Sequence, residues 1–319
     1  MNLPATFIDQ LREIFPSGAM ALDAATRTAY GYDNSRRESL PDAVVFPSSH
    51  DDVVALVAAC RAHRVPLTAR GRGTNTTGAT VPIAGGVVAS FERMNRIVRI
   101  EPADRLAVVE PGVLNAELQS ALEPHGLFWP PDPTSAPYCT IGGNLACNAG
   151  GPHTVKYGAS RDNILGVRAV AGNGTSFRSG THTTKGATGY DLTRIIVGSE
   201  GTLALITEAT LKLTPRPSAV RTLRACYADV ASAAAAVARI MAQPVTPRAA
   251  CSTAAWAASS ASGSPSTSIS SNAFAVAGAS PPRSRTSLSA ASSMNSSARG
   301  VTGCAMIRAT AAAAEATST

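Results

Sequence analysis

The sequence predicts an α+β fold of two α/β subdomains, one a small parallel β-α-β part and the other a mostly antiparallel sheet with helices. Two observations predict it. An apolar run at 43–46, an amphipathic stretch at 51–63 and a second apolar run at 65–69 follow one another at the spacing of a right-handed β-α-β unit. After residue 86, short strand-like segments joined by turns replace that pattern. The 319 residues are long enough for two ordinary domains.

The first elements are predicted from helical spacing and helix caps. Residues 5–15 place apolar side chains at helical intervals and stop at Pro16, which predicts an N-terminal helix. Ser48 or Ser49 can cap a second helix over 51–63, whose first turn is acidic. The apolar face of that helix is formed by Val53, Leu56, Val57 and Cys60.

Later elements follow from apolar runs bounded by turn residues. Strands are predicted at 87–91, 97–101, 106–110, 164–171, 175–178 and 202–213, with a helix at 114–122. A strand at 223–227 and an alanine-rich helix at 231–241 indicate the opening of another domain. We therefore divide the chain into a lead-in at 1–40, a main domain at 41–217, the start of a further domain at 218–248 and a tail at 249–319.

The tail differs from the rest in composition. From residue 249 onward there is no lysine, aspartate or histidine, and Ala, Ser and Thr dominate without a sustained helical or strand period. Such a segment buries too little apolar surface to offset its ordering entropy, so disorder is the default expectation. Two origins stay open. The tail is either a natural low-complexity segment or a frame-shifted reading of GC-rich codons.

Composition excludes several classes of protein. The formal charge of +7 is spread along the chain: four arginines and one acid after residue 248 contribute +3, and the first 248 residues contribute +4. No basic stripe with interleaved aromatics occurs. Nucleic acid is therefore not an expected partner. No apolar run approaches the roughly 18 residues of a membrane span, and a cytoplasmic location is expected. The six cysteines show no C-x-x-C spacing, so neither a disulfide framework nor a zinc site is expected.

A glycine loop follows the apolar run 65–69, with the sequence Arg70-Gly71-Arg72-Gly73-Thr74-Asn75-Thr76-Thr77-Gly78. Glycines allow consecutive N–H groups to turn inward around an anion, and a diphosphate is the natural guest. The guanidinium groups of Arg70 and Arg72 can add charge-assisted hydrogen bonds. The spacing fits neither a P-loop nor a Rossmann turn, and a polar surface turn between strands is the alternative.

Two further segments carry the same kind of signal. Prolines stiffen 130–135, and the following TIGGNLACNAGG at 140–151 permits close approach to a flat ring. The alternative for that stretch is a short helix that begins at G-G-N and ends at A-G-G, with Asn148 as a cap. The third segment is the turn G-S-E-G at 198–201, where Glu200 is either part of a site or a solvated corner.

Together these segments resemble the FAD-linked oxidases of the vanillyl-alcohol oxidase and p-cresol methylhydroxylase type, which carry an FAD-binding PCMH-type domain. The branch it resembles most holds the glycolate oxidase D subunit and the D-lactate dehydrogenases. The similarity extends from about Pro41 to Pro217 and is carried by RGRGTNTTG, VVEPGV, PPDPTS, TIGGNLACNAGG, KYG and GSEGTLALITEATLKL.

The resemblance implies that FAD is the cofactor and that it lies extended between the two subdomains. The amides of Gly71, Gly73, Thr74 and Asn75 would hold its pyrophosphate, while Glu200, Gly201 and Ile206 would lie near the nucleotide half. The full set of implied cofactor-binding residues is Arg70, Gly71, Arg72, Gly73, Thr74, Asn75, Gly78, Pro131, Asp132, Pro133, Thr140, Gly142, Gly143, Asn144, Asn148, Gly150, Gly151, Gly158, Glu200, Gly201 and Ile206.

The implied reaction is oxidation of a small 2-hydroxy acid, of the glycolate or D-lactate type, to the 2-keto acid by hydride transfer to flavin N5. An electron acceptor or partner subunit would then reoxidise the flavin. Enzymes of this kind take substrate-pocket histidines from a C-terminal domain, and no histidine follows His182 here. The resemblance therefore implies a chain that is truncated in its substrate domain and impaired. His153 is the one histidine near the ring-binding segment, and no catalytic residue or metal ligand is predicted.

Two other functions stay open. One is a non-catalytic FAD-binding or electron-transfer module whose site a partner subunit completes, which the absence of distal histidines favours. The other is a cell-wall reductase that shares the fold and uses a nicotinamide coenzyme, whose pattern lacks the P-D-P and G-S-E-G pair.

Overall fold

The structure is a computed structural model that describes residues 3–183, 186, 189–220, 225, 227, 229–244 and 247, together with the backbone of 252–255 and 304–307. The chain divides into two compact units. The first contains residues 1–151 and 158–216, and the second contains residues 152–157 and 217–319. Each unit is described by itself.

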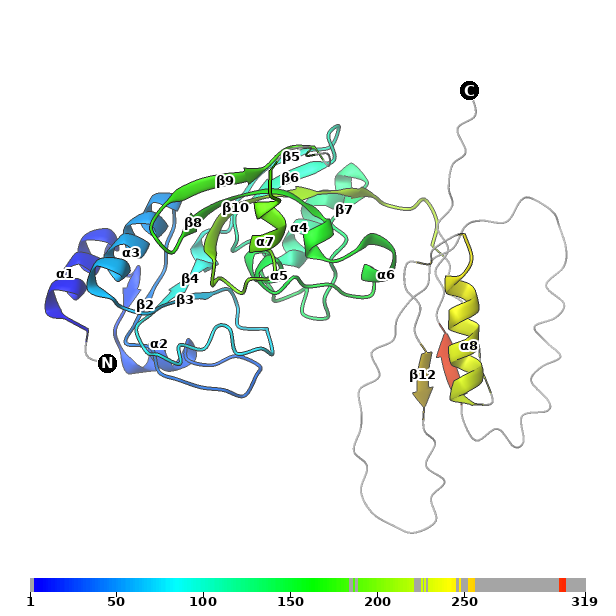
Figure 1. Cartoon of the computed structure of the whole chain (residues 1–319), viewed down its shortest axis with the longest axis horizontal. Coiled ribbons are helices and arrows are strands. Elements are labelled where there is room, and N and C mark those ends of the chain that lie inside the picture. Colours follow the sequence, from blue (N-terminus) through cyan, green and yellow to red (C-terminus); the bar gives the residue numbers. More distant parts are fainter. Residues whose placement is uncertain are drawn as a thin grey trace, which may run out of the picture. The chain divides into compact units, whose positions relative to one another are not determined.

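The first unit begins with a four-stranded sheet in the order β1-β2-β4-β3, of which β2, β3 and β4 are labelled in Figure 1. The strand β4 pairs in parallel with both β2 and β3, whereas β1 is antiparallel to β2. The crossover from β2 to β3 through α3 therefore skips one position in the sheet, which β4 fills later in the chain. The elements are α1 (Ala5–Ile14), β1 (Met20–Ala21), α2 (Ala24–Ala29), β2 (Ala43–Val45), α3 (His50–His63), β3 (Leu67–Arg70) and β4 (Val87–Ser90).

Helix α3 begins where its cap predicts. Ser49 accepts a hydrogen bond from the backbone N–H of Asp52, and the Asp52 carboxylate accepts from the backbone of Ser49 in return, which is a capping box. Its apolar face packs with α1 and the sheet into one buried cluster, in which Phe7, Leu11, Val53 and Leu56 have no exposed surface. This packing fixes where β3 ends and the glycine loop begins.

A five-stranded antiparallel sheet in the order β5-β6-β10-β8-β9 forms the other part of the same unit. Its core gathers strand residues with α4, α5 and α7, and the buried Trp129 donates its indole N–H to the carbonyl of Asn163 at 2.9 Å. The strands are β5 (Ile97–Glu101), β6 (Leu106–Val109), β8 (Ile164–Ala171), β9 (Ser176–Gly180) and β10 (Ala204–Lys212), and a short pair joins β7 (Leu127–Phe128) to β11 (Thr214–Pro215). The helices are η1 (Phe91–Arg93), α4 (Asn115–Leu122), η2 (Glu123–His125), α5 (Ile141–Ala146), η3 (Ser160–Asp162) and α7 (Leu192–Ile196).

The second unit is smaller in its described part. It contains α6 (Thr154–Tyr157) and α8 (Val230–Met241), the latter capped by Asp229, whose carboxylate accepts from the backbone N–H of Ser232. The short strands β12 (Ser252–Ala255) and β13 (Cys304–Ile307) pair antiparallel. The strand predicted at 223–227 and the rest of the predicted disordered or frame-shifted tail lie outside the described residues.

The predicted fold class is confirmed, because one unit holds both a parallel sheet and a mostly antiparallel sheet with helices. Among the described residues, no helix has the length and apolar character needed to cross a membrane.

Candidate functional site

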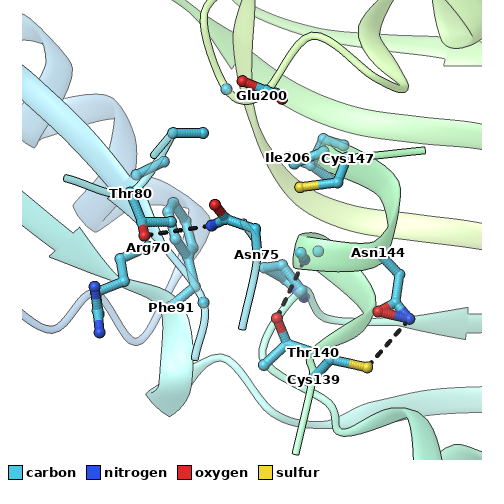
Figure 2. A pocket seen from close by; sticks show the side chains of 18 of the residues that line it. Arg70, Asn75, Thr80, Phe91, Cys139, Thr140, Asn144, Cys147, Glu200 and Ile206 are labelled. Atoms are coloured by element: carbon cyan, nitrogen blue, oxygen red, sulfur yellow. Dashed lines mark hydrogen bonds between the residues drawn. The ribbon is translucent and has the colours of Figure 1, made fainter. Parts of the chain in front are cut away.

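A cleft opens in the first unit where the three predicted segments meet (Figure 2). Its empty volume is about 1050 Å³, counting the space that opens to solvent. The predicted residues that line it are Arg70, Gly71, Arg72, Gly73, Thr74, Asn75, Pro133, Thr140, Gly142, Gly143, Asn144, Glu200, Gly201 and Ile206.

The glycine loop presents unused hydrogen-bond donors to this cleft. Among the described residues, the backbone N–H groups of Gly73, Thr74 and Asn75 donate to no protein acceptor. Gly73 has a φ of +64°, a left-handed conformation that favours glycine. The side chain of Asn75 closes the loop, because its Oδ1 accepts from the N–H groups of Thr77 and Gly78. A row of unpaired amides on a glycine loop is suited to an anion.

The two arginines of the loop have different surroundings. Arg70 is 7% exposed, and its Nη1 donates to the carbonyl of Tyr32 at 2.7 Å while its guanidinium lies 5.4 Å from the centre of the Tyr30 ring. Burial lowers the pKa of Arg70, against the opposing effect of Tyr30 and nearby carboxylates. Arg72 is half exposed and lies 3.9 Å from Glu92. Arg70 therefore supports the loop from inside, and Arg72 is the cation more open to a ligand.

The second segment forms the short helix α5, so a helix is present as the alternative for this stretch expects, but it runs from Ile141 to Ala146 and its C-terminal cap is Cys147 rather than Asn148. Thr140 is its cap, and the Thr140 hydroxyl accepts from the N–H of Gly143 at 3.1 Å. The N–H of Gly142 donates to the carbonyl of Pro111 at 2.8 Å. The amides of the glycine pair are thus used inside the protein, and the helix lines the cleft with its surface. A Cβ at Gly142 would lie 2.6 Å from the Cβ of Pro111, so this glycine permits close packing.

The third segment is tied to the end of α5. The N–H of Gly198 donates to the carbonyl of Leu145, and that of Glu200 donates to the carbonyl of Ala146, each at 2.9 Å. Glu200 has a φ of +55°, which is uncommon for a residue with a side chain. A Cβ at Gly201 would lie 3.3 Å from Ala69 at the end of β3. The turn is therefore hydrogen-bonded to the end of α5 and lies beside β3, the strand that leads into the glycine loop, and Glu200 lines the cleft.

Several predicted residues do not line the cleft and have structural contacts instead. The carbonyl of Pro131 accepts from Asn115, and Asn148 accepts from the N–H of Arg161. The glycines Gly78, Gly151 and Gly158 pack closely against Arg37, Asp132 and Asp162 respectively, and Gly150 directly follows the lining residue Ala149. A part in cofactor binding for these residues stays a prediction.

Other lining residues were missed by sequence reasoning. They come from strand ends and loop flanks that carry no motif of their own, except that Pro111, Ser135, Ala146, Cys147, Ala149, Ser199, Ala204 and Leu205 lie inside the quoted segments. The remainder are Ala69, Ala79, Thr80, Phe91, Cys139 and Ile196. A search for small residues next to each glycine segment is the signal that could have found most of them.

The titratable groups of the cleft are few. Its lining holds Arg70, Arg72, Cys139, Cys147 and Glu200, and no histidine or lysine. Burial raises the pKa of the Cys147 thiol, and the charge of Glu200 adds to that effect. No group of three potential metal-ligating side chains occurs in the part of the chain that the structure describes. A polar amide cradle beside a mostly apolar cleft defines this unit as a domain that binds a phosphate-bearing organic cofactor.

Comparison with known proteins specifies the cofactor. Residues 41–180 match the FAD binding domain family. The glycolate oxidase subunit GlcD of Bacillus subtilis is 44% identical over 224 residues, and the D-2-hydroxyglutarate dehydrogenase of Stutzerimonas stutzeri is 40% identical over 219 residues. These alignments take in 70% and 68% of this chain but 48% and 47% of the relatives, so the chain spans about half of their length.

A solved structure of p-cresol methylhydroxylase with substrate bound superimposes with a TM-score of 0.66 at 20% identity, over 74% of this chain and 48% of that one. This likeness shows the fold. Residues 41–180 thus match an FAD binding domain, and relatives of the chain are named a glycolate oxidase subunit, a D-2-hydroxyglutarate dehydrogenase and, in Mycobacterium tuberculosis, an FAD-linked oxidoreductase. The expected resemblance and the expected cofactor are confirmed.

Proposed function

We propose that this chain takes part in FAD-dependent oxidation of a small 2-hydroxy acid to the 2-keto acid. The observation that carries the proposal is the row of unpaired amides at Gly73, Thr74 and Asn75, three residues that line the cleft within a matched FAD binding domain. The names of the relatives supply the substrate class, since they act on glycolate and D-2-hydroxyglutarate. When bound, FAD supplies a ring that accepts a hydride. The hydroxy acid loses that hydride from Cα and a proton from its hydroxyl group.

The chain's own residues divide the work of binding. The three free amides would donate to the diphosphate, and the half-exposed Arg72 would add a charge-assisted contact. Helix α5 and Pro133, which line the cleft, would form a wall for the flavin, and the turn at Glu200 and Gly201 would lie near the nucleotide half. The predicted residues that do not line the cleft, such as Gly78, Pro131 and Gly158, would support these segments through their packing and hydrogen-bond contacts.

A second function is favoured by one observation. The residues that line the described cleft include no histidine and no lysine, so the possible bases among them are Glu200, which is expected near the nucleotide half, and the two cysteines Cys139 and Cys147. A non-catalytic FAD-binding or electron-transfer module, completed by a partner subunit, fits this lining. In either case we propose a domain at 41–217, a cytoplasmic location and reoxidation by an electron acceptor or partner subunit.

A reductive titration separates the two functions. The whole chain is reconstituted with FAD and titrated without oxygen with glycolate, D-lactate and D-2-hydroxyglutarate while the visible flavin band is followed. Bleaching by one of these acids supports the oxidoreductase. A flavin band that dithionite bleaches and none of the acids bleaches supports the module. Folded protein that retains no FAD contradicts both.

A further inference from the structure

The segment Tyr30–Ser39, which we call the brace, precedes the matched domain and contacts the glycine loop. It is a closed turn of chain, because the N–H of Ser39 donates to the carbonyl of Gly31 at 2.8 Å and Tyr32 bridges to Glu38 in antiparallel fashion. A Cβ at Gly31 would lie 2.6 Å from the carbonyl oxygen of Ser39, so the turn is also tightly packed. The brace is therefore a defined structure outside the matched residues 41–180.

Asn34 of the brace holds two carbonyl groups of the loop. Its backbone N–H donates to the carbonyl of Asn75 at 3.1 Å, and its Nδ2 donates to the carbonyl of Thr74 at 3.4 Å. In a planar trans peptide, the C=O of one residue and the N–H of the next point in opposite directions. Because the Thr74 carbonyl faces Asn34, the N–H of Asn75 points away from the brace. Asn75 lines the cleft, and its N–H is one of the unpaired donors.

Asp33 anchors the brace to the far end of the loop. The residue is 6% exposed, and its carboxylate accepts from the N–H of Ser35 at 2.8 Å and from the hydroxyl of Thr80 at 3.2 Å. Thr80 accepts in turn from Asn75 Nδ2 at 3.4 Å, the contact drawn in Figure 2. Burial opposes ionisation of Asp33, but the hydrogen bonds from Ser35 and Thr80 outweigh it, so its pKa is lowered. The carboxylate is charged at neutral pH.

Arg70 of the loop also contacts the brace. Its guanidinium donates to the carbonyl of Tyr32 and lies over the ring of Tyr30, and it offsets the nearby charge of Asp33. The brace and the loop thus contact each other directly at the carbonyl of Tyr32 and the amide groups of Asn34, and the carboxylate of Asp33 is linked to Asn75 of the loop through Thr80. None of these contacts uses the N–H groups that face the cleft.

We propose that the brace is a positioning element for the cofactor's diphosphate and that Asp33 is its main positioning residue. Asp33 acts in two ways: it accepts from the N–H of Ser35, which fixes the turn that carries Asn34, and it accepts from Thr80, which in turn accepts from the side chain of Asn75. Asn34 then holds the carbonyl groups of Thr74 and Asn75 and so orients the peptide groups of the loop. The inference rests on the proposed binding of FAD in the cleft. It extends the cofactor site to residues that precede the matched domain, and it locates their effect on the diphosphate rather than on the flavin ring.

The test compares three ligands on the apoprotein of the whole chain. FAD and ADP carry a diphosphate, whereas riboflavin carries the ring alone. Asp33→Ala is expected to lower the affinity for FAD and for ADP by about tenfold or more, which is the loss expected for hydrogen bonds to a charged group. The same change should alter the affinity for riboflavin by less than about twofold. Asp33→Asn keeps an acceptor oxygen for the N–H of Ser35 but presents an NH2 donor to the Thr80 hydroxyl, so it should restore part of the affinity. The matched control is Asp23→Ala, whose carboxylate accepts from Thr26 within α2.

Two results would overturn the inference. Asp33→Ala could bind FAD and ADP as tightly as the unmodified chain, or it could lose riboflavin by the same factor, which would indicate general loosening of the fold. If Asp33→Ala does not fold, Thr80→Val removes the hydroxyl that links Asp33 to Asn75 and is judged by the same comparison. Unmodified protein that binds none of the three ligands would contradict the proposed function instead.

Discussion

Replacing Gly73 by alanine tests the amide cradle at its most constrained point. With a φ of +64°, any residue with a side chain pays about 1–2 kcal/mol of backbone strain there. The added Cβ would also lie 2.5 Å from Nη2 and 2.9 Å from Cζ of Arg70. Arg70 is buried and bonded to the carbonyl of Tyr32, so moving its guanidinium costs a further 1.5–3 kcal/mol or so, as expected for a hydrogen bond to a charged group.

Gly174 supplies the matched control. It has a φ of +88° in the turn between β8 and β9, and a Cβ there would meet nothing within 4 Å. Gly174→Ala is therefore destabilised by the backbone strain alone. The apoprotein melting temperature of Gly73→Ala should fall below that of Gly174→Ala by roughly 3–12 °C, from about 2–4 °C per kcal/mol for a unit of this size. FAD affinity, measured by quenching of flavin fluorescence, should fall only in Gly73→Ala.

The reasoning would be refuted if the two variants had the same melting temperature and both bound FAD with the affinity of the unmodified chain. That result would show that Arg70 moves freely and that the loop does not set cofactor affinity. Loss of FAD in both variants would be equally damaging, because the Gly174 turn does not line the cleft.

Three further outcomes are expected. His50 bridges Thr207 and Ser176, and burial together with the charge of Arg168 lowers its pKa. Its contribution to stability is therefore full above the unfolded-state pKa of about 6.5 and is lost as the pH falls below that value. In urea unfolding, His50→Gln should lose less stability on acidification than the unmodified chain does. Asp52→Ala removes the capping box of α3 and should cost about 1 kcal/mol in the same melts, whereas the exposed neighbour Asp51→Ala should cost less. Cys147 lines the cleft with a pKa raised by burial, so it should alkylate slowly near neutral pH and more slowly still with FAD present, and modification at an equal rate with and without FAD would contradict its place in the site.

Local signals predicted the elements well where a cap or a period defines them. Helix α3 was predicted from an acidic first turn after two serines, and Ser49 proved to be the cap. Strand β8 has the predicted bounds, because apolar residues and the turn at 172–174 delimit it on both sides. The order of the parallel sheet could not be read in this way. Strand β4 enters between β2 and β3 through pairing that depends on residues far apart in the chain.

The site was predicted only in part, because some of its features depend on local backbone requirements and others on contacts between distant residues. The glycine loop and the turn at Glu200 carry backbone requirements that are visible in a sequence, and the cleft brings both together. In the 140–151 segment the glycines suggested contact with a ring, yet Gly142 is needed for packing against Pro111 within a helix. The contact of Asn34 with Thr74 and Asn75 joins positions about 40 residues apart without any motif, so no pattern could reveal it.

Hydrogen exchange of the whole chain with and without FAD tests the central claim most directly. Slowed exchange on FAD binding is expected together in the loop at 70–78, in the region of α5 at 140–149 and in the turn at 198–206, with no change in the hairpin of β5 and β6. Protection confined to one of these segments, or spread evenly over the chain, would contradict a single cleft built from all three.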